Sequence, residues 1–173
     1  MEYHEIGKTG MKVSSLSFGA SSLGGVFHDI KEKEGLEAVF TAIDLGMNFI
    51  DVSPYYGHYK AETALGKALK EIPREKYYLS TKVGRYGKDG VNTWDYSGKR
   101  ATESVYESME RLHVDYIDLI NVHDIEFADL NQVVNETLPA LVELREKGIV
   151  GHVGITDLQL ENLKWVIDHS PAG

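Results

Sequence analysis

The chain has 173 residues, of which 42% are hydrophobic and 26% are charged, and this is sufficient for one domain with a sizeable core. Its formal net charge of −9 argues against nucleic acids and anionic membranes as partners, because both need a basic binding face. The absence of cysteine excludes a disulfide framework and a thiol nucleophile.

The N-terminal region predicts a small hairpin and no targeting signal. Residues 1–12 are polar and lack the apolar core of a signal peptide, and no apolar run approaches the roughly 20 residues of a membrane-spanning helix. We therefore expect a cytoplasmic protein without a membrane partner. Two short extended runs, residues 3–6 and 12–14, flank a Gly-bearing turn at residues 7–10, which is typical of a β-hairpin.

The rest of the chain alternates short apolar runs with segments of helical periodicity. The predicted strands are residues 16–19, 47–51, 77–82, 116–122 and 149–155. The predicted helices are a segment from residue 33 to the Gly46 cap, 61–69, 102–112, 130–147 and 158–169. Residues 20–25 and 84–98 are predicted to be loops. Pro139 lies inside the fourth helix, which predicts a kink or a broken first half.

Five strand-then-helix units in succession predict an α/β fold with parallel strands and right-handed crossovers. An open doubly wound sheet and a (β/α)8 TIM-barrel type compete. The fingerprint GxGxxG is absent after the first strand, which favours the barrel. A complete barrel needs about 250 residues, so we expect residues 1–173 to form a single, incomplete domain of about five βα units. The chain would then be a truncated product, or another chain would complete the barrel.

Polar residues follow three successive predicted strands. Asp51, Lys82 and His123 stand at these strand ends, and Tyr56 lies on the loop after Asp51. Each has an ordinary structural explanation, namely a turn cap, a surface lysine, a satisfied core histidine and a packed ring. In a barrel, however, the carboxyl ends of the strands meet on one face, where active sites lie. Unpaired, each group would weaken the fold, whereas together they satisfy one another.

Such a cluster suits acid–base chemistry on a carbonyl. A free tyrosine titrates near pH 10, too weakly acidic to protonate an alkoxide well at neutral pH. A nearby ammonium group stabilises the phenolate, and Asp51 would hold that ammonium in place. Tyr56 then becomes a usable general acid or base, while His123 orients the carbonyl oxygen. No side chain donates a hydride, so a nicotinamide cofactor is implied; no metal site is predicted.

The sequence contains four short motifs, DVSPYYG at residues 51–57, STKVG around Lys82, DLINVHD around His123, and GITD at residues 154–157. With these motifs it resembles the aldo-keto reductase family over its whole length, about five of the family's eight units. The runs SFGASSLGGVFHD, HDIEF and VVNETLPALVEL point further to the L-galactose dehydrogenase-like group. In this family an N-terminal hairpin closes the barrel floor.

The resemblance implies specific site residues. It implies a catalytic tetrad, listed here in chain order: Asp51, Tyr56, Lys82 and His123. Tyr56 rather than Tyr55 is chosen because it precedes Gly57. The implied cofactor contacts are Ala20, Ser21, Asp51, Thr156 and Asp157. Asp157 replaces the family's usual asparagine and loses an amide donor. The aromatic residues that would wall the substrate pocket, or simply pack locally, are Tyr86, Trp94 and Tyr96.

The predicted function is that of an NAD(P)-dependent oxidoreductase, L-galactose dehydrogenase-like, that interconverts a sugar-like alcohol and its carbonyl or lactone form. Its partners would be NADP or NAD and a small carbonyl or sugar substrate. One alternative is a non-catalytic, cofactor-sensing regulatory subunit on the same fold. Another is an inactive truncated product. The sequence leaves open the choice of NAD or NADP, the exact substrate and the oligomeric state.

Overall fold

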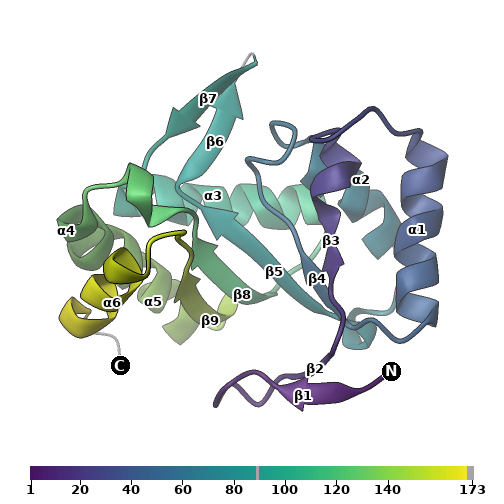
Figure 1. The fold of residues 1–173 in the computed structure, drawn as a ribbon, viewed down its shortest axis with the longest axis horizontal. Helices are drawn as coiled ribbons and strands as arrows, with labels where there is room; N and C mark the ends of the chain where they lie inside the picture. The colour runs from purple at the N-terminus through teal and green to yellow at the C-terminus, as the bar shows by residue number, and fades with distance from the viewer. Residues whose placement is uncertain (89, 171–173) are drawn as a thin grey trace.

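A five-stranded parallel sheet forms the centre of the structure (Figure 1). The computed structural model describes residues 1–88 and 90–170. In spatial order the strands are β3 (Phe18–Gly19), β4 (Phe49–Asp51), β5 (Tyr78–Val83), β8 (Ile117–Val122) and β9 (Val150–Ile155). All four neighbouring pairs are parallel, as predicted. β3 and β9 are the two edges and do not pair with each other, so the described strands form an open sheet.

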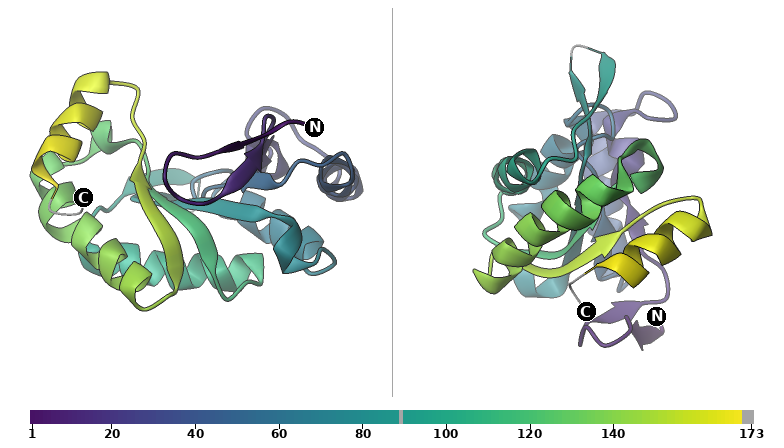
Figure 2. Two further views of the ribbon diagram at one scale, coloured as in Figure 1. Left: turned by 90° about the horizontal axis from the view of Figure 1, so that it is seen from below. Right: turned by 90° about the vertical axis from the view of Figure 1, so that its left-hand side faces the viewer.

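Helices follow the strands and lie along one face of the sheet, as the left view of Figure 2 shows. The α-helices are α1 (Glu32–Asp44), α2 (Lys60–Leu69), α3 (Gly98–Leu112), α4 (Leu130–Gln132), α5 (Leu138–Glu146) and α6 (Leu160–His169). Short 3-10 helices are η1 (Ala20–Gly24), η2 (Arg74–Lys76) and η3 (Ile125–Phe127). This arrangement has one helical layer, as in part of a barrel, and not the two layers of a doubly wound sheet. None of the described helices is long and apolar enough to cross a membrane.

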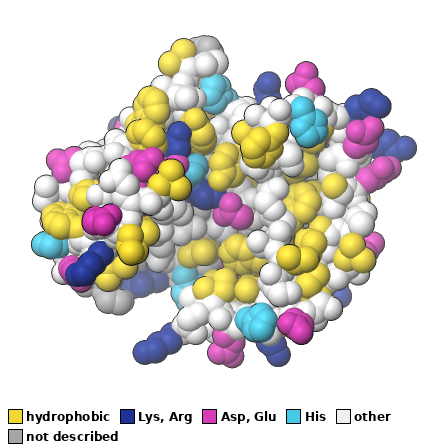
Figure 3. All heavy atoms as spheres, in the orientation of Figure 1, with side chains coloured by type: hydrophobic (Ala, Val, Ile, Leu, Met, Phe, Trp, Pro, Cys, Tyr) yellow, Lys and Arg dark blue, Asp and Glu magenta, His cyan; other side chains and the backbone are white. Residues whose placement is uncertain are grey.

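The hydrophobic core lies between the sheet and this helical layer. Alternate strand residues face opposite sides, and Ile50, Leu79 and Ile120 on the helix side are completely buried. Their neighbours on the other side, such as Tyr78 and Leu119, are only half-buried. Figure 3 shows hydrophobic side chains across the front face of the molecule, with many charged side chains toward its outline. In a closed barrel the half-buried side of the sheet would be the interior.

Two hairpins lie at opposite ends of the sheet (Figure 1). The predicted N-terminal hairpin is confirmed as β1 (Tyr3–Glu5) and β2 (Lys12–Ser14). Asn48, just before β4, accepts a hydrogen bond from the Ser14 N–H at 2.7 Å and donates one to the Lys12 carbonyl at 2.9 Å. The first hairpin is therefore fixed at the amino ends of the strands.

The second hairpin corrects the prediction of a loop over residues 84–98. This segment contains β6 (Arg85–Lys88) and β7 (Val91–Trp94), paired antiparallel. His58 packs against it, because a Cβ atom at Gly87 would lie 1.9 Å from the His58 ring. His58 Nε2 also lies 3.1 Å from the Asn92 side-chain oxygen. The Asp-Gly dipeptide at positions 89–90 of the sequence is a known hairpin signal that the prediction did not use.

The predicted break near Pro139 is confirmed. Between α4 and α5 the chain forms one π-helical segment, η4 (Val133–Thr137), and the Leu138 N–H bonds the Val133 carbonyl five residues earlier. Proline has no N–H to donate and its ring obstructs a regular preceding turn. The wider π turn accommodates this at the start of α5. Within residues 20–25, predicted as a loop, Ala20–Gly24 instead form η1.

A buried carboxylate ties α2, β5 and α3 together. The Glu62 side chain on α2 is completely buried. It accepts a hydrogen bond from the Thr81 hydroxyl at 2.7 Å and forms an ion pair with Arg111 Nε at 2.7 Å. A buried charge is tolerated only when it is paired and hydrogen-bonded, and both conditions hold here.

We expect Glu62→Ala to lower the free energy of unfolding by about 3 kcal/mol, because it removes the buried carboxylate partner of Arg111 and leaves the guanidinium with only the weaker ion pair to Glu107 at 3.7 Å. Urea denaturation followed by circular dichroism measures the change. The control is Glu103→Ala, which removes an exposed carboxylate on α3 and should change stability by at most about 1 kcal/mol. Equal effects of the two substitutions would contradict a structural role for the Glu62 network.

Candidate functional site

The turn after β4 is held by a close backbone contact. A Cβ atom at Gly24 would lie 2.6 Å from the Tyr56 carbonyl oxygen, and one at Gly57 would lie 2.1 Å from the Gly24 carbonyl oxygen. Gly57 also has a φ of 62°, which favours glycine. Two glycines thus allow η1 and the turn to touch, and this contact sets the position of Tyr56 at the carboxyl end of the sheet.

Lys82 lies on β5, and its side chain is only 6% exposed. Its Nζ donates to Asp51 Oδ2 at 2.6 Å and to the Val52 carbonyl at 2.9 Å. The Ser80 hydroxyl donates to the second Asp51 oxygen at 3.0 Å. The carboxylate therefore compensates a nearly buried ammonium group, as the predicted pairing of Asp51 and Lys82 requires.

Tyr56 is the tyrosine beside this ammonium group. Lys82 Nζ lies 4.9 Å from the centroid of the Tyr56 ring, and the His123 ring lies perpendicular to it at 5.7 Å. The Tyr55 ring instead lies under the Arg85 guanidinium, 3.9 Å from its central carbon. The structure thus brings together the four side chains predicted as a tetrad; Tyr55 also packs edge-on against the His123 ring, at 5.9 Å, but its ring carries the Arg85 guanidinium and not the Lys82 ammonium.

His123 is neutral at physiological pH. Burial, the neighbouring Lys82 ammonium and, more weakly, Arg85 lower its pKa to about 3, against the opposing effect of Asp124. Its Nδ1 lies 3.1 Å from the hydroxyl oxygen of Ser53, which is completely buried. A neutral imidazole can donate one hydrogen bond from one nitrogen, which suits it to hold a carbonyl or hydroxyl oxygen.

Sequence reasoning missed an ion pair at this site. Arg85 and Asp124 contact each other directly, and the guanidinium is sandwiched between the rings of Tyr55 and Phe127. Asp124 Oδ2 lies 3.6 Å from His123 Nε2. Asp124 directly follows His123 in the sequence and takes a left-handed φ of 45°. This adjacency in DLINVHD was the available signal, whereas Arg85 lay in the segment predicted as a loop.

The three predicted pocket aromatics have different environments. Tyr86 and Tyr96 are buried, and the Tyr96 hydroxyl donates to the His123 carbonyl at 2.7 Å. Burial raises the pKa of both phenols, so they stay protonated. Trp94 is 44% exposed and packs beside Phe127, with 5.7 Å between ring centroids. Trp94 alone of the three is thus accessible to a ligand, while the other two support the structure locally.

The residues predicted to contact the cofactor are already engaged in part. Ala20 is completely buried within the core, and Ser21 is half-buried beside it on η1. The Thr156 hydroxyl accepts from the Asp124 N–H at 2.8 Å and donates to the Asp124 carboxylate at 3.2 Å. Asp157 accepts from the Gln159 N–H at 2.7 Å, where it acts as a turn cap.

These contacts allow a test of whether a nicotinamide carboxamide fits. The Thr156 hydroxyl retains one free lone pair, and the half-buried Asp157 offers only acceptors. Together they suit the amide nitrogen of a carboxamide, which donates two hydrogen bonds. They offer no donor for its carbonyl oxygen. Thr156 and Asp157 therefore fit the amide nitrogen of the carboxamide but not its carbonyl oxygen.

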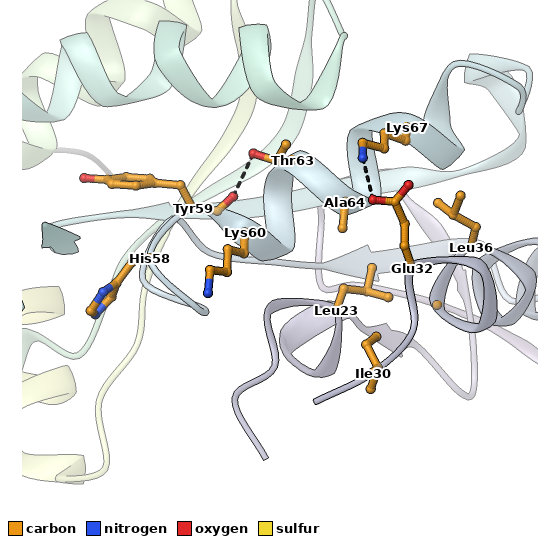
Figure 4. Close-up of a pocket in the computed structure, with 11 residues that line it drawn as sticks. Leu23, Ile30, Glu32, Leu36, His58, Tyr59, Lys60, Thr63, Ala64 and Lys67 are labelled. Atoms are coloured by element: carbon orange, nitrogen blue, oxygen red, sulfur yellow. Dashed lines mark hydrogen bonds and ion pairs between the residues drawn. The ribbon is translucent and has the colours of Figure 1, made fainter. Parts of the chain in front are cut away.

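A groove of about 380 Å³ lies between η1, α1 and α2, away from this site (Figure 4). Leu23, Ile30 and Leu36 line it with His58 and Lys67, and Lys67 pairs with Glu32 at 2.5 Å. No tetrad side chain lines it. Within the described part of the chain, no group of three or more histidine, aspartate and glutamate side chains is arranged to hold a metal ion.

Comparisons with known proteins show which family the sequence matches. The sequence matches the family model described as "Aldo/keto reductase family" over residues 15–172. It is 46% identical to an L-galactose dehydrogenase of Arabidopsis thaliana, over 100% of this chain and 54% of that protein. It is 36% identical to a D-arabinose 1-dehydrogenase of Saccharomyces cerevisiae, over 91% of this chain and 47% of that protein. The chain thus spans about half the length of these curated relatives.

A solved structure has the same fold. An aldo-keto reductase of Bacillus halodurans in its holo form superposes with a TM-score of 0.87 at 31% sequence identity. The superposition covers 99% of this chain and 55% of that one. This chain therefore corresponds to about half of that structure.

The low pKa of His123 predicts how stability depends on pH. The unfolded chain binds a proton at this histidine below about pH 6.5, whereas the folded chain does not until pH about 3. The free energy of unfolding should therefore decrease as the pH falls through this window. The variant His123→Gln lacks this titrating group, so its free energy of unfolding should decrease less between about pH 7 and pH 4. Urea denaturation at the two pH values measures the difference.

His4→Gln serves as the control for this experiment, because His4 is exposed on β1. It should lose stability on acidification in parallel with the unsubstituted chain. The same dependence in His123→Gln and in the unsubstituted chain would show that the histidine is not held neutral by the fold.

Proposed function

Because the chain belongs to the aldo/keto reductase family, we propose that it carries the catalytic site of an NAD(P)-dependent oxidoreductase acting on sugar-like alcohols and their carbonyl or lactone forms. The observation that carries the proposal is the position of Lys82. Its ammonium group lies between the Asp51 carboxylate and the Tyr56 ring, next to the neutral His123. We place the protein in the cytoplasm, where a soluble sugar substrate is accessible.

The phenol of Tyr56 moves the proton in this proposal. Two N–H groups of Lys82 are bonded to Asp51 and Val52, and the third remains for the phenolic side. This positive charge stabilises the phenolate. In the oxidative direction the phenolate removes the proton of the substrate hydroxyl; in the reductive direction the phenol returns it to the carbonyl oxygen. The nicotinamide, when bound, accepts or supplies the hydride.

His123 positions the substrate oxygen in this reaction. Its neutral ring can donate a hydrogen bond without competing with Tyr56 as an acid. Burial of Lys82 and His123 strengthens the electrostatic effect of both groups on the reacting oxygen. Thr156 and Asp157 would hold the amide nitrogen of the cofactor, since both retain acceptor capacity.

Sugar-like substrates are proposed from two observations. The names of both relatives given above describe dehydrogenases of a sugar. The rim of the site carries the charged pair Arg85 and Asp124 next to His123, and such groups suit the several hydroxyl groups of a sugar better than an apolar carbonyl compound.

We expect Tyr56→Phe to reduce turnover by on the order of 10²–10⁴-fold, because only the phenolic hydroxyl is removed. Initial rates with NAD or NADP and aldoses would be measured in the 173-residue chain and in any longer protein that contains it. Cofactor binding should remain close to that of the unsubstituted protein. Tyr55→Phe is the matched control and should retain activity, since Tyr55 packs on Arg85. If Tyr55→Phe lost activity and Tyr56→Phe retained it, Tyr55 and not Tyr56 would be the residue that moves the proton.

We expect Lys82→Met to abolish most activity and to move the residual oxidative activity to higher pH, because the phenolate loses its neighbouring charge. The pH–rate profile measures this shift. Lys67→Met is the control, since Lys67 is an exposed lysine on α2 that pairs with Glu32. An unshifted profile in Lys82→Met would indicate a structural lysine.

The unsubstituted protein distinguishes the rival functions. Dinucleotide binding without turnover on any aldose would support a cofactor-sensing regulatory subunit. Neither binding nor turnover would support an inactive product. Isothermal titration with NAD and NADP, followed by the same rate assay, separates these outcomes.

A further inference from the structure

We propose that Ser53 is a positioning residue that holds His123 as the tautomer with its proton on Nε2. The catalytic role of this tautomer rests on the proposed function, in which the His123 Nε2–H group donates a hydrogen bond to the substrate oxygen. Its structural basis is independent of turnover.

Ser53 is the third residue of the DVSPYYG turn and has two hydrogen-bonding contacts. Its hydroxyl oxygen accepts a hydrogen bond from the Tyr55 N–H at 3.1 Å. The same oxygen lies 3.1 Å from His123 Nδ1. Ser53 is completely buried and His123 is 4% exposed, so both groups depend on protein partners.

Counting donors and acceptors decides the direction of the second bond. A serine hydroxyl has one hydrogen to donate. Across the described residues, the only acceptor found for that hydrogen is Nδ1. If Nδ1 carried the proton instead, it would donate to Ser53 and the hydroxyl hydrogen would be buried without a partner. An unsatisfied buried donor is costly, so the hydroxyl donates and Nδ1 accepts.

The opposite side of the ring leads to the same tautomer. Nε2 lies 3.6 Å from Asp124 Oδ2. A lone pair on Nε2 would face this carboxylate unfavourably, whereas an N–H group is attracted to it. Asp124 is itself fixed by its ion pair with Arg85 and its contacts with Thr156. Ser53 on one side and Asp124 on the other thus both favour the proton on Nε2.

The inference gives the turn sequence a second purpose. The stretch from Asp51 to Gly57 supplies the carboxylate for Lys82 and the phenol. Through Ser53 it also sets the donor of a histidine 70 residues further along the chain. An ordinary structural explanation is that Ser53 only caps its own turn through the Tyr55 N–H. That explanation does not predict which nitrogen of the His123 ring carries the proton.

The test is a long-range ¹H–¹⁵N correlation spectrum of the ¹⁵N-labelled chain at about pH 7, where His123 is neutral. The His123 signals are identified by their loss in His123→Gln. We expect the pattern of a ring protonated at Nε2, with an Nδ1 resonance displaced by hydrogen bonding. A proton on Nδ1 in the unsubstituted chain would overturn the proposal outright.

The Ser53→Ala variant then tests the role of the hydroxyl. The Nδ1 resonance should move to the position of an unbonded nitrogen, and an Nδ1-protonated population should become detectable. Ser53→Thr, which keeps the hydroxyl, should restore the original pattern. Ser108→Ala is the matched control, since it removes another buried hydroxyl on α3, and should leave the His123 signals unchanged. Identical His123 signals in Ser53→Ala and the unsubstituted chain would refute a positioning role.

These spectra need no turnover, so they stand apart from the proposed reaction. If Ser53→Ala does not fold, the spectrum of the unsubstituted chain still decides the tautomer. Where the protein is active, we expect Ser53→Ala to lower kcat and to leave cofactor affinity unchanged. The decrease should be smaller than about 10²–10³-fold, the cost of removing a preorganised donor altogether, because the imidazole is still present. Loss of the tautomer with an unchanged kcat would refute the catalytic meaning alone.

Discussion

The nearly buried ammonium group of Lys82 is the constraint on which the carboxyl end of the sheet depends. Removing such a charge from water costs several kcal/mol unless partners replace the solvent. The Asp51 carboxylate and the Val52 carbonyl provide those partners. The next residue back along β5, Thr81, faces the other side and bonds the buried Glu62. β5 is therefore anchored by polar contacts on both faces, which gives the Lys82 ammonium group a rigid support.

Much of the fold could be read from the alternation of apolar runs and helical segments, because burial against a single helical layer imposes that pattern. The five parallel strands, the N-terminal hairpin and the break before Pro139 all follow from local chemistry. The hairpin of β6 and β7 could not be read in this way. The four residues of β7 are all exposed, so no burial pattern marks this strand, and only the Asp-Gly dipeptide in the sequence was informative.

The site shows the same division between local and spatial information. Asp51 and His123 each follow an apolar run and Lys82 ends one, so their convergence could be predicted from strand ends alone. The pairing of Arg85 with Asp124 is a contact between distant segments that no local pattern encodes. The same holds for Thr156, whose hydroxyl bonds Asp124 across the sheet edge. Burial of Tyr86 and Tyr96 likewise depends on α3 and the His123 carbonyl, and not on their own neighbours in sequence.

The contact between His58 and the second hairpin has a consequence for sequence divergence. At Gly87 there is no room for a side chain beside the His58 ring, and Asn92 bonds the same ring. The hairpin is thereby tied at its Gly87–Asn92 pair to the loop that follows Tyr56. Val91, by contrast, is 63% exposed. Substitutions at Val91 can therefore accumulate without disturbing this contact, so homologous proteins are free to diversify this exposed position while inheriting the same reaction centre.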